Sequence, residues 1–128
     1  MLVEATFDEA GAYTIVLEGK PVVPGGDRLP DPPVLFLGSL GACAGLYALR
    51  YLQARGLAFA GLRVLTESAY IDNPRRLGDI RLQVILPAPV EDRHLAPLRR
   101  SIELCTLKNS LAYPPTVVAF LSAPAAAA

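Results

Sequence analysis

"VLFLGSLGACAGLYALRYLQAR", residues 34–55, is the longest apolar segment of this chain, and the other elements are expected to pack around it. It carries no charge from Val34 to Leu49, and Pro33 and Gly56 stand at its two ends. Proline fits the first turn of a helix, and glycine fits the position just after the last turn. The stretch is therefore predicted to form one long helix that is apolar on every side.

A helix that is apolar all round is either the core helix of a soluble protein or a membrane span. The uncharged run extends from Pro32 to Leu49, slightly short of the roughly 20 residues that a span needs. The segments on either side alternate between apolar and polar residues, as the strands of soluble proteins do. We therefore expect a buried core helix and no association with a membrane.

A stripe of small residues, Gly38, Gly41, Gly45 and Ala48, runs along this helix. Each glycine inside a helix costs about 1 kcal/mol relative to alanine, so the stripe should have a packing reason. The expected reason is the close approach of another backbone, such as the same helix of a second subunit.

The segments around the helix predict an α+β fold. Strands come first, then the long helix, a hairpin with a longer loop, a second helix and a last strand, so strands and helices do not alternate strictly. The antiparallel sheet is expected to pack one face on the helices, within a single domain over residues 1–128 whose tail from residue 124 is frayed. The predicted strands are 2–8, the two arms of 13–23 joined at Gly19, 60–72, 80–87 and 116–122, and the second helix lies within 89–105.

Composition narrows the possible partners. Hydrophobic residues make up 52% of the chain and charged residues 19%, which suggests that a second copy covers some apolar surface. Basic and acidic residues balance at 12 each, so there is no broad positive field for nucleic acid. The start "MLVEATFDEAG" is acidic and unlike a secretory signal, so a cytoplasmic location is expected.

The two cysteines, Cys43 and Cys105, do not form a CxxC pair, and with one histidine they make a poor zinc site. From the residues alone, Cys43 is either a small core hydrophobe or a thiol held for chemistry. Arg50 lies on its side of the helix and could approach it only by bending back. His94 is expected to be exposed in the acidic and basic start of the second helix. No cofactor motif is present.

Two stretches resemble the OsmC/Ohr family. "DPPVLFLGSLGACAGLYALRYL", residues 31–52, is similar to the central helix of that family, which carries the reactive cysteine. "CTLKNSL", residues 105–111, resembles the motif of its second cysteine. The order of the predicted elements also matches, so the similarity extends over nearly the whole chain.

The resemblance implies an intertwined homodimer in which two long helices cross at the centre, with active sites at the subunit interface. It also implies reduction of a small apolar hydroperoxide in oxidative-stress defence, with no cofactor. Cys43 would attack the peroxide and become a sulfenic acid, Cys105 would resolve it as a disulfide, and a dithiol reductant would reopen that disulfide.

The chain departs from the peroxidase members of that family in one respect. They carry an arginine near the first strand turn and a glutamate ten residues before the first cysteine. This chain has "DEAG" at the turn and Pro33 at the second place. Arg28, Arg50 and Lys108 are the candidate substitutes for the activating charge. The alternatives are a non-enzymatic relative that binds an apolar ligand or senses oxidants, and a purely structural role for both cysteines.

Overall fold

The computed structural model describes residues 1–126 except residue 8 and residues 24–29. The chain divides into two compact units, Met1–Phe36 and Leu37–Ala128. Antiparallel strands and helices follow one another in the predicted order through the second helix, which confirms the α+β class. The assignment of residues 1–128 to one domain stays a prediction.

The first unit contains a three-stranded antiparallel sheet in the order β1-β2-β3. Glu18 and Gly19 both have positive φ, 51° and 77°, and they form the tight turn between β2 and β3 that was predicted at Gly19. The side chains of β1 are exposed along its whole length. The bounds are Val3–Phe7 for β1, Tyr13–Leu17 for β2 and Lys20–Val23 for β3.

The long helix α1 spans Pro32–Ala54, close to the predicted 34–55. It ends in a Schellman motif, in which Gly56 has a φ of 65° and its N–H donates to the carbonyl of Gln53. The N–H of Leu57 donates to the carbonyl of Leu52 at 2.9 Å in the same motif. The predicted stop at Gly56 is therefore confirmed, because glycine adopts positive φ without strain.

Only one stripe of α1 is buried: Leu40, Gly41, Ala44, Ala48 and Leu52. The opposite side is open, and Leu46 is 49% exposed there. The expectation of a helix buried on every side is therefore wrong for the single chain. The hairpin and the second helix of the same chain are too few to surround α1, so they cover only one of its sides.

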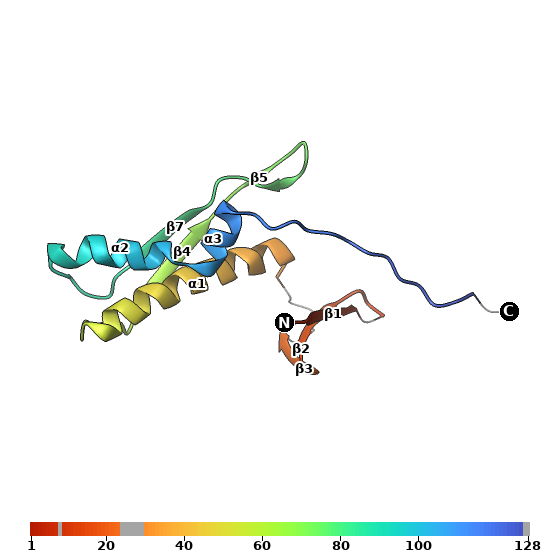
Figure 1. Ribbon diagram of the computed structural model, residues 1–128, viewed down its shortest axis with the longest axis horizontal. Coiled ribbons are helices and arrows are strands. Elements are labelled where there is room, and N and C mark those ends of the chain that lie inside the picture. Colours follow the sequence, from red (N-terminus) through yellow and green to blue (C-terminus); the bar gives the residue numbers. More distant parts are fainter. Residues whose placement is uncertain (8, 24–29, 127–128) are drawn as a thin grey trace. The chain divides into compact units, whose positions relative to one another are not determined.

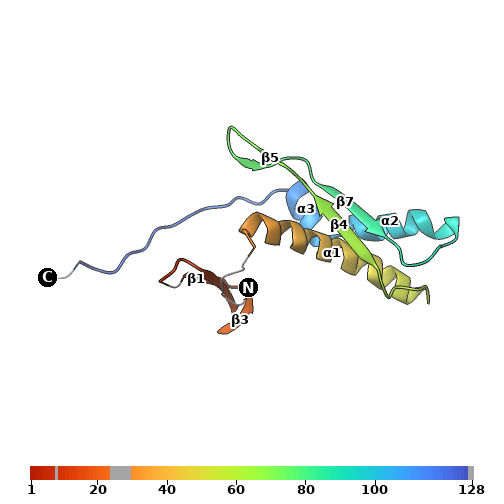
Figure 2. The ribbon, with the colours of Figure 1, turned by 180° about the vertical axis from the view of Figure 1, so that it is seen from behind.

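The predicted hairpin is present, and it lies along α1 and the second helix, α2 (Leu95–Glu103), on one side of them (Figures 1 and 2). Val64 pairs with Val84 and Thr66 with Leu82, so these four side chains share the face toward the helices. A second short pairing closes the loop end of the hairpin. The bounds are Arg63–Glu67 for β4, Tyr70–Ile71 for β5, Arg76–Leu77 for β6 and Arg81–Ile85 for β7.

The glycines of α1 admit strand β4 of the same chain. A Cβ atom added at Gly41 would lie 2.5 Å from the Thr66 hydroxyl, and one at Gly45 would lie 3.2 Å from a methyl of Val64. At Gly38 no atom lies within 4 Å of that position. The expected packing reason therefore exists for Gly41 and Gly45, but it is a strand and not a second helix.

The second helix is shorter at both ends than the predicted 89–105. A 3₁₀ turn over Asp92–His94 leads into α2, Leu95–Glu103, and Leu98 is its buried residue. Cys105 lies after the end of α2 and not on its apolar face. A third helix that was not predicted, α3, follows over Thr106–Ala112.

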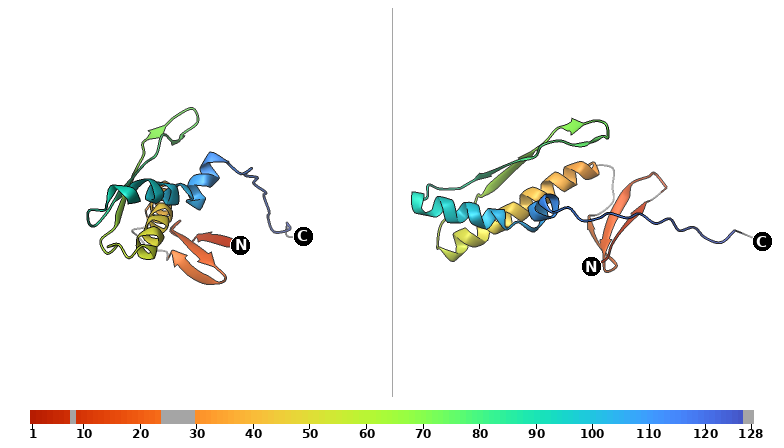
Figure 3. Two further views of the ribbon diagram at one scale, coloured as in Figure 1. Left: turned by 60° about the vertical axis from the view of Figure 1, so that its left-hand side comes forward. Right: turned by 45° about the horizontal axis from the view of Figure 1, so that its top comes forward.

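The predicted last strand over 116–122 is absent: residues 113–126 hold no helix or strand in the structure, and the chain runs away from α3 (Figure 3). Phe120 and Leu121 are 91% and 97% exposed. A strand needs a partner for its backbone hydrogen bonds, and no strand in the described part of the chain pairs with this segment.

By length and composition, α1 could cross a membrane. Its most apolar 18 residues have a mean hydropathy of 1.5, and 22% of that segment is buried. The core helix of a soluble protein passes the same test. Here the helix carries a strand against Gly41 and Gly45 and hydrogen bonds to α2 from Tyr47 and to the adjoining 3₁₀ turn from Tyr51.

Candidate thiol site

The two cysteines meet inside one chain. Cys43 projects from the middle of α1, and Cys105 lies in the link between α2 and α3. Cys105 forms a buried cluster with Leu40 and Ala44, against which Cys43 packs. Both thiols are free, and they share a hydrogen bond in which Cys105 donates to Cys43.

A short link between α2 and α3 places Cys105. The N–H of Leu104 donates to the carbonyl of Ser101, and the N–H of Cys105 donates to the carbonyl of Ile102, which ends α2 in a tight turn. The hydroxyl of Ser101 donates to the carbonyl of Tyr47 at 2.9 Å and so joins this turn to α1. Cys105 is thereby held beside the middle of α1.

Cys105 also caps α3. Its backbone is extended, with φ −50° and ψ 119°, and its sulfur accepts the N–H of Lys108 at 3.5 Å. This is the arrangement of an N-cap side chain, which occupies one of the N–H groups left free at a helix start. Its exposed fraction is 0%, so Cys105 is completely shielded from solvent by the chain itself.

The pKa of the Cys43 thiol is lowered. Burial acts to raise this pKa, but it is outweighed by hydrogen bonding from the backbone N–H of Leu107, from the Cys105 thiol and from the N–H of Thr106, and by the charge of Arg50. Each of these stabilises the thiolate. Cys43 is therefore the thiol that ionises first, and it is the half-buried one of the two.

The pKa of Cys105 is raised. Burial is the largest cause, and the neighbouring Cys43 adds to it because a proton shared with Cys43 stays on Cys105. The N–H groups of Lys108 and Leu107 oppose the shift without overcoming it. The pair thus consists of one thiol poised to be a nucleophile and one poised to keep its proton.

The three candidate cations differ in their relation to the thiols. Arg50 lowers the pKa of Cys43, and its guanidinium stands 5.1 Å from the centre of the Tyr47 ring. The ammonium group of Lys108 is paired with Glu103, and only the backbone of Lys108 contacts a sulfur. Arg28 lies outside the described residues.

The sequence pattern predicted neither α3 nor the side-chain contact between Tyr47 and Thr106 at the site. Thr106 and Leu107 bring their N–H groups to Cys43 because a helix begins directly after Cys105. Tyr47 bonds Thr106 through its hydroxyl at 3.1 Å. The available signals were the absence of Gly and Pro from 105–113 and the helix stop at Pro114 and Pro115.

His94 is buried, with 7% of its surface exposed, and the expectation that it is exposed is therefore wrong. Its Nδ1 is hydrogen bonded to the hydroxyl of Tyr51 at 2.9 Å, and the two rings meet edge to face. The 3₁₀ turn before α2 directs His94 toward α1, which a uniform helical pattern from residue 89 did not indicate. This contact lies one helical turn from Tyr47, further along α1.

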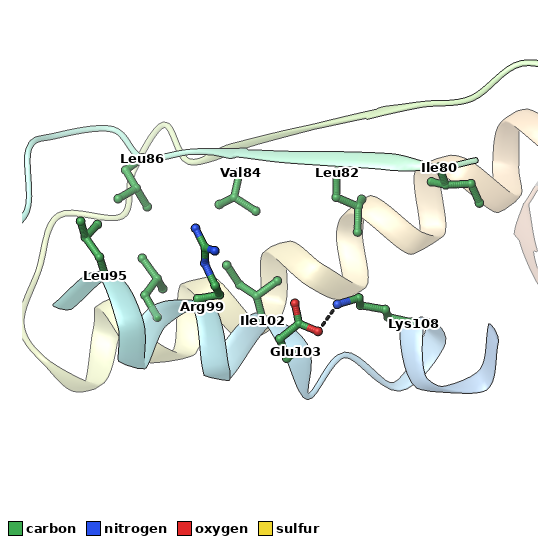
Figure 4. A pocket seen from close by; sticks show the side chains of 10 residues that line it. Ile80, Leu82, Val84, Leu86, Leu95, Arg99, Ile102, Glu103 and Lys108 are labelled. Carbon is green, nitrogen blue, oxygen red and sulfur yellow. Dashed lines mark hydrogen bonds and ion pairs between the residues drawn. The ribbon is translucent and has the colours of Figure 1, made fainter. Parts of the chain in front are cut away.

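An apolar groove of about 520 Å³ lies between β7 and α2 (Figure 4). The side chains of β7 point toward α2, and Arg99 reaches up between them from the helix. Neither cysteine lines the groove, but Ile80, Leu82 and Ile102 belong both to its wall and to the packing around Cys105. The other lining residues are Val84, Leu86, Leu95, Leu98, Arg99, Glu103 and Lys108.

Metal-ligating residues do not gather at the site. Within the described ranges, no group of three or more His, Cys, Asp or Glu side chains is placed to hold a metal ion. The chemistry that the site offers is that of its two sulfurs.

The chain is similar to solved structures of known proteins. A candidate osmotic stress induced and detoxification response protein from Psychrobacter arcticus matches with a TM-score of 0.73 and 13% identity, over 86% of this chain and 87% of that one. An OsmC-like protein from Mycoplasma pneumoniae matches at 0.69 and 18%, over 87% and 86%. An organic hydroperoxide resistance protein OsmC from Legionella pneumophila matches at 0.62 and 15%, over 86% and 87%.

These identities are low, so the likeness shows the fold. No curated protein matches the sequence significantly. The model of one protein family, described as OsmC-like protein, matches residues 25–119 and so includes both cysteines. The chain belongs to the OsmC-like protein family.

Proposed function

We propose that this protein reduces organic hydroperoxides with Cys43 as the attacking thiol and Cys105 as the resolving thiol. The proposal includes a homodimer in the cytoplasm and a dithiol reductant that restores both thiols. Family membership and the organic hydroperoxide resistance protein among the similar structures support the reaction class.

The first step is an attack of the Cys43 thiolate on the terminal oxygen of the hydroperoxide. The O–O bond breaks, an S–O bond forms, and the alkoxide that leaves takes a proton to become an alcohol. Cys43 is thereby oxidised to sulfenic acid. The lowered pKa of Cys43 supports this role, since the thiolate is the nucleophile.

The second step joins the two sulfurs. The Cys105 thiol attacks the sulfenic sulfur, a disulfide forms and water leaves. A dithiol then reduces that disulfide by thiol–disulfide exchange and becomes a disulfide itself. The raised pKa of Cys105 keeps its thiol protonated. Cys105 therefore does not compete with Cys43 for the peroxide and remains available for the second step.

One arrangement supports this proposal most strongly: two free thiols, far apart in sequence, pack together at one buried cluster, and their contact lowers the pKa of Cys43 and raises the pKa of Cys105. Packing alone would not require such a pair. A purely structural role would place the two sulfurs among apolar side chains, where burial raises both pKa values.

The homodimer is supported by what the single chain leaves uncovered. The described residues bury only six hydrophobic side chains, while large apolar ones stay open on α1 and on the C-terminal segment. An exposed apolar surface of this extent marks an interaction site in a soluble protein. The residues concerned include Val34, Phe36, Leu46, Val117, Val118, Phe120 and Leu121.

A second candidate function is binding of an apolar ligand without catalysis. It is favoured by the groove between β7 and α2 and by Pro33, which stands where the peroxidase relatives carry glutamate. In this case the thiols would sense oxidants or only fill space.

Counting thiols after oxidation separates the two candidates. The reduced protein is mixed with cumene hydroperoxide or hydrogen peroxide, and free thiols are counted against time. We expect both thiols to be lost, faster with the organic peroxide. Cys43→Ser should leave Cys105 almost inert, and Cys105→Ser should stop at a sulfenic acid that a dimedone probe traps.

Slow oxidation with no preference for the organic peroxide would overturn the enzymatic proposal and support a ligand binder or sensor. Binding of a fluorescent apolar probe, weakened by Leu82→Lys in the groove, would then identify that function. Thiols that react only after unfolding would show that both cysteines are structural.

A further inference from the structure

We propose that Tyr47 is a positioning residue, which holds the start of α3 so that its backbone N–H groups face the sulfur of Cys43. The inference rests on the proposed function only in taking Cys43 as the reactive thiol. It concerns a residue that neither the family match nor the sequence pattern assigns to the site.

The position of Tyr47 on α1 makes this contact possible. Tyr47 follows Cys43 by one helical turn, on the same side of α1. Side chains on a helix lean toward its N-terminus, which favours a ring position near Cys43, and both side chains pack against the cluster of Leu40, Ala44 and Cys105. From there its hydroxyl lies 3.1 Å from Oγ1 of Thr106, the first residue of α3.

Tyr47 also binds the other side of the link that contains Cys105. Its carbonyl accepts the hydroxyl of Ser101 at 2.9 Å, near the end of α2. The end of α2 and the start of α3 are therefore both attached to one residue of α1. Cys105 lies between these two attachments in the sequence.

Besides the contact with Tyr47, the cap by Cys105 and the ion pair of Lys108 with Glu103 in α2 hold α3. Thr106–Ala112 is a short helix, and none of its residues is buried. Helices of this length are marginal without tertiary contacts, because so few hydrogen bonds offset the loss of chain entropy. The Tyr47–Thr106 hydrogen bond and the cap by Cys105 are thus important for keeping the first turn in place.

The Tyr47 ring also contacts Arg50. The guanidinium of Arg50 stands over it at 5.1 Å from the ring centre, a cation–π contact. Arg50 is the charge that stabilises the Cys43 thiolate. One aromatic side chain therefore contacts both the cation and the helix start that act on Cys43.

The chain offers a closely matched control in Tyr51. It stands one turn further along α1, its hydroxyl is hydrogen bonded to His94, and Arg55 stands over its ring at 5.1 Å. Tyr51 thus resembles Tyr47 in residue type, helix and contacts. It differs in its partners, because neither His94 nor Arg55 is among the groups that shift the pKa of Cys43.

The experiment measures the rate of iodoacetamide alkylation of Cys43 against pH in the reduced full chain, with mass spectrometry to identify the labelled residue. We expect Tyr47→Phe to slow alkylation at neutral pH by roughly two- to tenfold, as expected when one hydrogen bond is weakened. The pH profile should move to higher pH. Tyr51→Phe should leave the profile unchanged, whatever its effect on melting temperature.

Thr106→Val tests the same contact from the other partner and should shift the profile in the same direction. Combined with Tyr47→Phe, it should add little further, since both remove one interaction. An unchanged profile in Tyr47→Phe, or an equal shift in Tyr51→Phe, would overturn the proposal. Alkylation needs no peroxide, so a protein that fails to reduce peroxides but shows these shifts would refute the reaction and keep the role of Tyr47.

Discussion

At the scale of the residue, the site depends on how differently the two sulfurs are surrounded. Cys43 is half-buried and receives N–H groups, a thiol proton and a nearby positive charge, all of which favour its thiolate. Cys105 is fully buried and keeps its proton beside Cys43. Reactivity should therefore differ between two residues of the same type in one cluster.

The pH dependence of labelling follows from these shifts. A lowered pKa means that Cys43 becomes a thiolate, and reactive, at a pH below that of an ordinary cysteine. Below that lowered pKa its reactivity is lost, and above it the reactivity is constant. We expect Cys105 to be labelled only at higher pH, and peptide mapping after brief alkylation will show the order. Equal labelling of both cysteines at every pH would contradict this prediction.

Arg50 is expected to have a small effect that salt can screen. Its charge is the last of the causes that lower the pKa of Cys43, and its side chain is exposed. Arg50→Gln should slow alkylation of Cys43 by less than about threefold at low salt and hardly at all at high salt. Arg55→Gln, which removes a similar charge from beside Tyr51, is the control and should have no effect. A large loss that persists in salt would mean that Arg50 contacts the sulfur directly.

At the scale of the element, α1 has two different sides. One side receives β4 at Gly41 and Gly45, and the other is uncovered in the single chain. The close contact with the strand explains why glycine is tolerated in a helix despite its cost. The same helix carries Cys43, so the packing of β4 on α1 also fixes the position of the thiol.

Two glycine substitutions test this asymmetry. Gly41→Ala places a Cβ 2.5 Å from the Thr66 hydroxyl and should destabilise the protein by about 1–3 kcal/mol, as overpacking does. Gly38→Ala meets no atom within 4 Å and should stabilise the helix by up to about 1 kcal/mol. Urea unfolding of both variants measures the difference. A loss of stability in Gly38→Ala would show that another chain approaches α1 there.

At the scale of the whole molecule, the single chain leaves more apolar surface open than a stable monomer usually does. Leu46 on α1 and Phe120 and Leu121 near the C-terminus are well exposed. The proposed second copy would cover such surface, and it would offer the C-terminal segment a strand with which to pair. The predicted strand over 116–122 could form only in that context.

The dimer can be tested by mass. Light scattering at micromolar concentration should give twice the mass of the 13.6 kDa chain. Leu46→Glu places a charge on the open side of α1 and should produce monomers, because an unpaired charge is costly to bury. Leu46→Met, which conserves volume, should leave the dimer intact. A wild-type protein that stays monomeric would contradict the prediction.

The elements whose cause is local could be predicted from the sequence: the strands with period-two patterns, the turn at Gly19, and α1 between its proline and its terminal glycine. The OsmC-like family was also recognisable from its two cysteine motifs. The packing of β4 on Gly41, the burial of His94 and the N–H groups that α3 supplies to Cys43 became evident from the folded chain alone. These features depend on contacts between residues far apart in the chain, and local periodicity carries no information about such contacts.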